Sequence, residues 1–305
     1  MYAKPPKKIG FRSEENISTW KMYAGFTLIE LLTVMAVISV IAAILLPALN
    51  QVRRQGRIIT GANNQRQIVT AANLFALDND DFYPESVATI GYVGSWNWSE
   101  PMMLTGYRAR SPRLHRSMSA YIYSYIKDAD IMFCPNAPHE YEYLKEAWVA
   151  GNHWDNPETL PFQDPVSGTY CFYWNYTGHL EERDYLFQGP ANITDGTSNS
   201  KLLVSDYFGY NHWRSRQCYS SCEKFADASV TEGTLLSSDY WSSEVIDVSG
   251  IPEIKLHAGY TDGHVQKFSS SDTFTMRVIL EPKTGEPYPE HIEPGKFFLP
   301  RDALH

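Results

Sequence analysis

The side chains of His257, Asp262 and His264 have the types and the spacing to do chemistry. Histidine and carboxylate side chains bind metal ions, and a histidine beside a carboxylate can act as a general acid or base. The Asp262–Gly263 dipeptide also signals a two-residue hairpin turn, where flanking histidines are commonly surface residues. We favour the turn and keep a metal site or a catalytic pair as the alternative. Because the sequence has no G-x-S-x-G or H-E-x-x-H motif and no phosphate-binding glycine loop, we predict that the protein is not an enzyme.

Three aspartates, Asp78, Asp80 and Asp81, form a second candidate site. Calcium is a hard cation that takes carboxylate oxygens, so this cluster could ligate calcium. The EF-hand pattern is absent, because its sixth position lacks glycine and its twelfth lacks glutamate. Aspartates also favour solvated turns, which is the interpretation that we prefer. Apart from this calcium alternative, we expect no cofactor.

The four cysteines are Cys134, Cys171, Cys218 and Cys222. They are too few for a disulfide-dense scaffold but enough for one or two bridges, and four cysteines allow three pairings. We predict Cys218–Cys222 together with Cys134–Cys171. Zinc is the rival partner, but a lone C-x3-C without a second close ligand pair supports it only weakly.

Glu30 is the most unusual charged residue, because it lies in an apolar run. From Phe26 to Leu46 the chain has 21 residues and one charge. A helix of that length spans about 31 Å, close to the hydrocarbon thickness of a bilayer. A carboxylate at the centre of a membrane helix costs about 2.5–3.5 kcal/mol, and less near an end, so Glu30 needs a cationic partner. The alternative is that Glu30 reaches the lipid head groups and pairs with nothing.

Residues 1–25 precede this run and carry five basic and two acidic side chains, a net charge of +3. This composition is similar to the basic start of an export signal. A secretory signal would place a small-residue cleavage site after the apolar run, but here the run continues into Pro47 and a polar helical pattern. The small residue lies before the run instead, as Gly25.

Residues Gly25 to Leu32 read GFTLIELL, which resembles the N-terminal signature of type IV pilins and type II secretion pseudopilins. The resemblance implies that a prepilin peptidase cleaves between Gly25 and Phe26 and methylates the new N-terminal amine. It also implies that Glu30 pairs with the α-amine of a neighbouring subunit in a filament. Pro47 would then kink the helix or melt it locally.

This resemblance implies a structural subunit of a type II secretion pseudopilus or a type IV pilus, and the large head favours a minor subunit. Its partners would be the prepilin peptidase, other pilin or pseudopilin subunits through the N-terminal helix, and an inner-membrane assembly platform. We expect a single span in the bacterial inner membrane, a cytoplasmic leader and a periplasmic head, and later a filament. Arg53, Arg54 and Arg57 follow the span and weaken the positive-inside bias. The net charge of -9 argues against nucleic acid as a partner.

One long helix and a separate head must position these residues. Apolar side chains recur at helical spacing over 48–77, which predicts that the helix covers 26–77, with its first half in the membrane. The head, 78–305, is rich in turn-forming residues and has short apolar runs. We therefore predict an α+β fold with a mainly β head and long loops. The expected strands are 120–126, 169–176, 201–208, 253–260 and 264–268.

Three head patterns are similar to those of large pilin-like proteins of the planctomycete and lentisphaera type. They are Phe133-Cys134-Pro135, Ile193–Asn199 (ITDGTSN) and Asp262-Gly263-His264-Val265. The tryptophans spread over the head favour an aromatic core over a sugar-stacking platform. The alternative function is a membrane-anchored carbohydrate-binding or enzymatic head that uses a pilin-type anchor.

Overall fold

The computed structural model contains two compact units, Met1–Val52 and Arg53–His305, and we describe each by itself. One α-helix, α1 (Leu28–Leu77), begins in the first unit and ends in the second. The structure describes residues 27–88, 100–104, 118–135, 145, 148, 168–183, 185–194, 198–211, 217–220, 255–281, 286–287 and 295–304.

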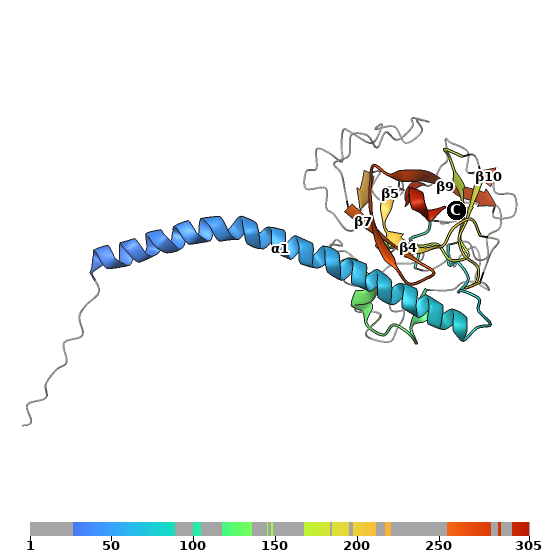
Figure 1. Cartoon of the computed structure of the whole chain (residues 1–305), viewed down its shortest axis with the longest axis horizontal. Coiled ribbons are helices and arrows are strands. Elements are labelled where there is room, and N and C mark those ends of the chain that lie inside the picture. Colours follow the sequence, from blue (N-terminus) through green and yellow to red (C-terminus); the bar gives the residue numbers. More distant parts are fainter. Residues whose placement is uncertain are drawn as a thin grey trace, which may run out of the picture. The chain divides into compact units, whose positions relative to one another are not determined.

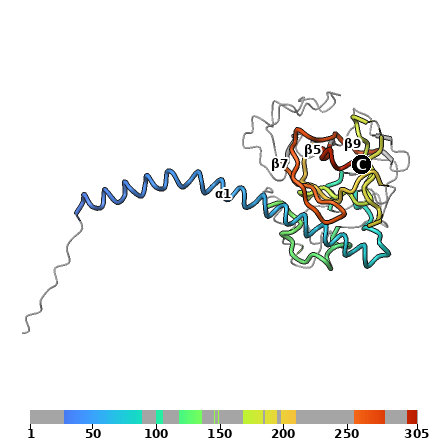
Figure 2. Tube along the Cα trace, viewed as in Figure 1, coloured from blue at the N-terminus to red at the C-terminus, as the bar shows by residue number. Residues whose placement is uncertain are grey.

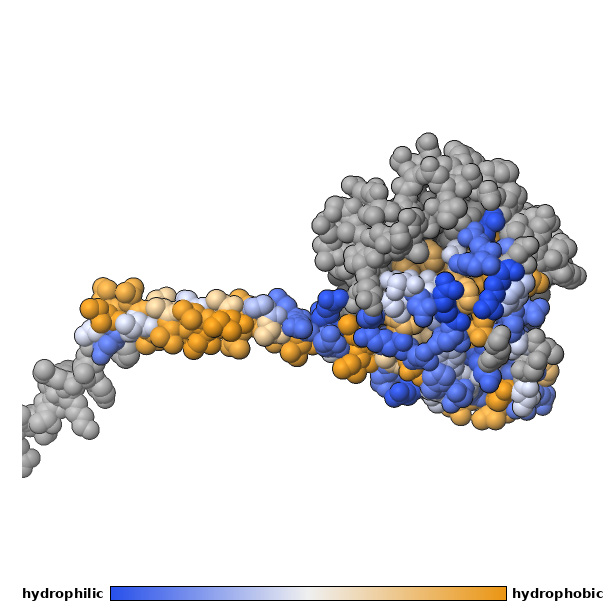
Figure 3. Space-filling model, turned by 45° about the horizontal axis from the view of Figure 1, so that its top comes forward, coloured by the Kyte–Doolittle hydropathy of each residue, from blue (hydrophilic) through white to orange (hydrophobic). Residues whose placement is uncertain are grey.

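In the first unit, the large aliphatic side chains of α1 are exposed. Leu28 and Ile29 are 83% and 71% exposed, and the larger aliphatic side chains from Leu31 to Leu49 are exposed as well. Figure 3 shows this apolar surface along the visible face of the helix. Within the described residues, α1 is the helix that is long and apolar enough to cross a membrane. A helix that is apolar all round must be covered by lipid or by other helices.

Pro47 lies inside α1, and the α-helix continues on both sides of it. Proline has no backbone N–H, so the carbonyl of Ala43 loses its usual helical partner. The hydrogen bonds of the flanking turns are enough to keep the segment helical. Local melting at Pro47, one of the two predicted effects, is therefore absent from this state of the chain.

In the second unit, α1 is amphipathic, as its apolar spacing predicts. Its buried positions recur every three or four residues, so they form one stripe along the helix. They are Ile58, Gly61, Asn64, Gln65, Ile68, Val69, Ala71, Ala72 and Ala76. Beyond Leu77 the chain turns, and Asp80 and Asp81 adopt positive φ angles of 54° and 66°. Aspartate tolerates this left-handed conformation better than most residues, which explains the end of the helix at an Asx cluster.

The described strands form two antiparallel sheets, which confirms the α+β prediction. The first sheet has the order β1-β4-β7-β8, from β1 (Tyr170–Phe172), β4 (Leu202–Asp206), β7 (Lys255–Tyr260) and β8 (Val265–Ser269). The second half of α1 runs beside this sheet (Figures 1 and 2). The approach is close at Gly259 of β7, where a Cβ would lie 2.7 Å from Cγ2 of Val69.

The second sheet has seven strands and the order β3-β2-β9-β11-β5-β6, with β10 paired to β9. Its long central strand β9 (Thr273–Glu281) pairs with β2 (Thr177–Leu180) and with β11 (Gly295–Pro300). The remaining strands are β3 (Tyr185–Gln188), β5 (Phe208–Asn211), β6 (Gln217–Ser220) and β10 (Glu286–Pro287).

The predicted strand 120–126 is wrong, because this segment contains the short helix α2 (Met118–Ile122) followed by a turn. Tyrosine and isoleucine alternate here, which favours a strand locally. The buried residues are Met118, Ile122 and Ile126, however, and their spacing of four is helical.

Two short 3-10 helices complete the described elements, at Ala129–Met132 and Arg301–Ala303.

The hairpin between β7 and β8 is present, but its loop differs from the predicted two-residue Asp-Gly turn. Tyr260 N donates to the carbonyl of His264 at 3.0 Å, so three residues separate the last pair. Gly263 has a φ of 90°, a left-handed conformation that glycine adopts without strain. A three-residue loop with glycine in this position is the next most common way to close a hairpin.

Both sheets and the second half of α1 contribute to one hydrophobic cluster. Aromatic side chains dominate it, and Trp148 and Trp174 are almost completely buried. Phe208 and Phe298, from β5 and β11, pack with ring centroids 4.7 Å apart. The prediction that tryptophans form the core is confirmed for these two residues.

Candidate functional site

A capping box formed by Thr27 and Glu30 opens α1. The backbone nitrogen and the hydroxyl of Thr27 both donate to Oε2 of Glu30 at 2.8 Å, and the Glu30 nitrogen donates to the Thr27 hydroxyl at 3.2 Å. This reciprocal pattern satisfies N–H groups that the first turn of a helix leaves without partners. Gly25 and Phe26, the predicted processing site, lie outside the described residues.

The other polar side chains of the apolar segment are also satisfied within the helix. The Thr33 hydroxyl donates to the carbonyl of Glu30 at 3.0 Å, and the Ser39 hydroxyl donates to the carbonyl of Met35 at 2.7 Å. In a bilayer each polar group needs a partner inside the protein, because hydrocarbon supplies none. Between Thr27 and Leu46, every polar side chain therefore has a hydrogen-bond partner within the helix itself and needs none from the lipid.

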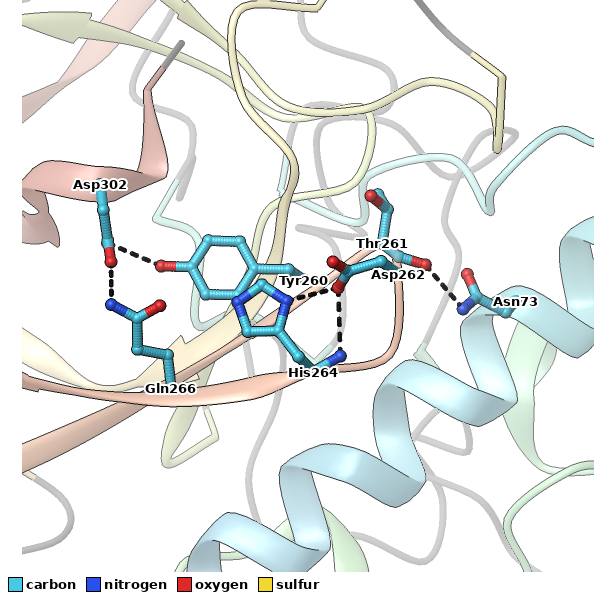
Figure 4. Close-up of polar contacts among 7 residues, drawn as sticks. All are labelled: Asn73, Tyr260, Thr261, Asp262, His264, Gln266 and Asp302. Atoms are coloured by element: carbon cyan, nitrogen blue, oxygen red, sulfur yellow. Dashed lines mark hydrogen bonds and ion pairs between the residues drawn. The ribbon is translucent and has the colours of Figure 1, made fainter.

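Amide side chains on the buried stripe of α1 and beside it hold the helix on the head. Nδ2 of Asn64 donates to the carbonyls of Asp130 and Phe133, at 2.9 and 3.2 Å. Nδ2 of Asn73 donates to the carbonyl of Thr261 at the β7–β8 loop, at 3.0 Å (Figure 4). These directional contacts fix the rotation and the axial position of the helix on the head, which apolar packing alone specifies less strictly.

A third amide, Gln65, reaches a buried carboxylate. Its Nε2 donates to Oδ1 of Asp206 at 2.8 Å, and both side chains are fully buried. The other oxygen, Oδ2, accepts from the backbone nitrogen of His257 at 2.8 Å and lies 3.3 Å from Nδ1 of the same residue. Hydrogen bonds on both oxygens offset the desolvation of Asp206. His257 thus pairs with Asp206, which the sequence interpretation did not consider, and not with Asp262.

Asp262 and His264 lie together on the β7–β8 loop, and their side chains are partly exposed. Both the backbone nitrogen and Nδ1 of His264 contact Oδ1 of Asp262 (Figure 4). Burial raises the pKa of Asp262, but the hydrogen bonds from His264 outweigh burial and lower the pKa below its ordinary value. The ring of His264 stacks on Tyr260 with centroids 4.4 Å apart. The contacts order the hairpin loop, as the favoured turn interpretation expected.

The three aspartates after α1 do not converge. Asp78 accepts from the Tyr125 hydroxyl at 2.8 Å, and this hydrogen bond raises the pKa of Tyr125. Asp80 and Asp81 form the left-handed end of the helix. Among the described residues, no group of three or more His, Cys, Asp or Glu side chains is placed to hold a metal ion. The positive φ angles of Asp80 and Asp81 fit the turn interpretation of this cluster.

The predicted Cys134–Cys171 disulfide is a further correction, because both residues are buried thiols that form no disulfide. Cys171 points into the core from β1, where burial raises the pKa of its thiol. The backbone nitrogen of Cys134 donates to the Thr169 hydroxyl at 2.8 Å, which positions the chain after the 3-10 helix. Of the other predicted pair, Cys218 lies in β6 and Cys222 lies outside the described residues.

Single residues in or next to the three head patterns make structural contacts. The backbone carbonyls of Phe133 and Thr261 accept hydrogen bonds from the side-chain amides of Asn64 and Asn73. The side-chain amide of Asn199 accepts from the backbone nitrogen of Gln188 and donates to the carbonyl of Leu186. Thr27, Gln65 and Asp206 are the residues that sequence reasoning missed. The S/T-x-x-E spacing of a capping box was visible for Thr27, whereas Gln65 and Asp206 carry no local signal.

Comparison with curated proteins and with solved structures finds no match to the chain. Residues 20–46 match the family model described as the prokaryotic N-terminal methylation motif. This segment contains Gly25, Phe26, Thr27 and Glu30, and it ends just before Pro47. With its apolar helix and its β-rich head, the chain therefore carries the signature of type IV pilins and pseudopilins in an α+β pilin-like fold.

Proposed function

We propose that the protein is a structural subunit that prepilin peptidase cleaves between Gly25 and Phe26 and that then assembles into a type II secretion pseudopilus or a type IV pilus. The observation that carries this proposal is the position of Glu30. It is the single charge of an exposed apolar helix, in the turn that follows the methylation motif's glycine. An exposed apolar helix of this kind resides in a lipid bilayer. When it leaves the bilayer, its apolar surface can be covered only by similar helices.

Cleavage would give Phe26 a free α-amine next to the capping box. An amine of a neighbouring subunit can donate to Glu30 with a charge-assisted hydrogen bond, which is stronger than the neutral bonds from Thr27. In hydrocarbon, leaving either charge without its partner is costly, so the pair would fix the stagger between neighbouring helices. The subunit would wait in the bacterial inner membrane, with a cytoplasmic leader and a periplasmic head, for the assembly platform.

The large head, residues 78–305, favours a minor or specialised subunit over the main building block of a filament. The described part of the head supports a structural role, since its polar contacts hold α1 and close turns. We therefore propose a non-enzymatic function.

The first test is mass spectrometry of the mature N-terminus, made on protein from the cells that produce it. We expect a chain that begins with N-methyl-Phe26. A chain that keeps Met1 would overturn the proposal, and a membrane-anchored enzymatic or carbohydrate-binding head would become the leading interpretation.

The second test separates assembly from processing. Glu30→Gln removes the charge but keeps the size of the side chain, so we expect the leader to be cleaved and cross-linked multimers to be lost. Glu85→Gln is the matched control, because it makes the same change on an exposed residue of the head. Normal multimers in Glu30→Gln would contradict the proposed pairing.

A further inference from the structure

Three arginines, Arg53, Arg54 and Arg57, form a basic face on α1 soon after its apolar part. Their side chains are all exposed. Spacings of three and four residues place Arg57 on the same side of the helix as the other two. We name these three residues the arginine face.

The arginine face lies at the depth of lipid phosphates when the apolar part of α1 crosses a bilayer. From Leu28 to Leu49 a helix rises about 32 Å, which fits a hydrocarbon core of about 30 Å. Arg53 follows four residues later, about 6 Å farther along the helix. The head-group layer extends roughly 5–8 Å beyond the hydrocarbon on each side. Arginine side chains are long enough to turn their guanidinium groups into that layer.

The arginine face is positively charged, whereas the chain that follows it is strongly acidic. Residues 58–305 contain 18 Lys and Arg against 32 Asp and Glu, a net charge of -14. Such a head is repelled by an anionic membrane surface, while the arginine face is attracted to it. Basic residues on the far side of a span also oppose the positive-inside bias, so their presence there needs another reason.

We propose that the arginine face binds the phosphate groups of anionic phospholipids in the leaflet that adjoins the head. Guanidinium groups donate paired N–H groups to phosphate oxygens, which makes arginine better suited than lysine to this contact. The inference rests on the proposed function, in which the subunit is stored in a membrane, and it adds the class of lipid that holds the subunit there.

The test uses the full chain in phosphatidylcholine vesicles that contain either spin-labelled phosphatidylglycerol or spin-labelled phosphatidylcholine. Electron paramagnetic resonance then measures how strongly each labelled lipid associates with the protein. At low salt we expect a preference of roughly fivefold or more for phosphatidylglycerol, since each surface arginine contributes about that factor. The preference should fall to about one in R53Q/R54Q/R57Q, remain largely in R53K/R54K/R57K, and weaken in about 1 M salt.

The matched control is K127Q/K201Q/K267Q, which removes the same charge from exposed lysines elsewhere on the head. We expect it to keep the preference. An unchanged preference in R53Q/R54Q/R57Q would overturn the proposal, as would an equal loss in the control.

Two outcomes separate this inference from neighbouring ones. If R53Q/R54Q/R57Q loses cross-linked multimers in cells but keeps the lipid preference, the arginine face contacts acidic side chains of a second copy and the lipid site is wrong. An uncleaved chain that still prefers phosphatidylglycerol through these arginines supports the lipid site and contradicts only the proposed function.

Discussion

Glu30 accepts two hydrogen bonds from Thr27, one from the backbone nitrogen and one from the hydroxyl, each 2.8 Å long. The carboxylate therefore has partners before any second subunit is present. This lowers the cost of holding Glu30 in a membrane, because its charge is partly compensated within the first turn. An incoming amine would have to join or replace the bonds from Thr27, so assembly would exchange one set of partners for another.

Thr27→Val should loosen the start of α1, because valine keeps the shape of threonine but lacks the hydroxyl that makes two of the three hydrogen bonds of the capping box. Loss of an N-cap costs about 1 kcal/mol, which corresponds to roughly fivefold easier opening of the first turn. Hydrogen exchange at the Glu30 amide, measured on the full chain in micelles, should accelerate by about that factor. Thr27→Ser keeps a hydroxyl and should stay near the wild-type rate. Equal rates in the two variants would show that the box does not stabilise the turn.

Gln65→Leu should destabilise the head, because it leaves Oδ1 of Asp206 buried without its donor. Loss of a hydrogen bond to a buried charged group costs about 1.5–3 kcal/mol. For a unit of this size the midpoint of thermal unfolding should fall by roughly 4–10 °C. Gln67→Leu is the matched control, since Gln67 is exposed on the opposite side of the same turns. A similar fall in both variants would assign the effect to the added leucine and not to Asp206.

Alkaline pH should destabilise the head through Tyr83. Burial raises the pKa of Tyr83 to about 12, and its hydroxyl donates to Oδ1 of Asn73 at 2.7 Å. In the unfolded chain tyrosine titrates at about 10. Between these pH values the folded state keeps a proton that the unfolded state has released, so this contribution to stability is complete below about pH 10 and is lost as the pH rises through about 12.

Chemical unfolding of the full chain at pH 9, 10 and 11 measures this loss. Phenylalanine cannot ionise, so the free energy of unfolding of Tyr83→Phe should decline less steeply as the pH rises. At pH 9 this free energy should be lower than in the wild type, because the variant lacks the hydrogen bond to Asn73. A slope remains in the variant, because burial also raises the pKa of Tyr173 and Tyr260. Identical slopes in the two proteins would mean that Tyr83 does not couple folding to pH.

The sequence predicts features that depend on local periodicity. Prediction from the sequence fails where a contact with a residue far along the chain determines the structure. The span, the amphipathic half of α1 and the β7–β8 hairpin all follow from spacing within a few residues. The contact between Gln65 and Asp206 joins residues 141 positions apart, and a glutamine on a helix is normally a solvent-facing residue.

The errors have the same origin. The alternation over 120–126 favours a strand, but Met118, Ile122 and Ile126 are buried at helical spacing once the core forms around them. The predicted Cys134–Cys171 pairing is one of three that four cysteines allow, and sequence spacing says nothing about whether two sulfur atoms meet in space.

Gly259→Ala should destabilise the head, because the close approach of α1 to β7 leaves no room for a side chain. A Cβ on Gly259 would lie 2.7 Å from Cγ2 of Val69 and 3.0 Å from Cγ1 of Val204. Overpacking of a core costs about 1–3 kcal/mol, and the unfolding midpoint of the full chain in micelles should fall accordingly.

Val69→Ala in the same chain should recover part of this loss, since it removes the nearer methyl group. Gly56→Ala is the matched control, because a Cβ there meets nothing within 4 Å and alanine favours a helix over glycine by about 1 kcal/mol. We expect that variant to be as stable as the wild type or more stable. If Gly259→Ala were equally well tolerated, α1 could shift away from β7, and the amide contacts of Asn64, Gln65 and Asn73 would not hold it in one position.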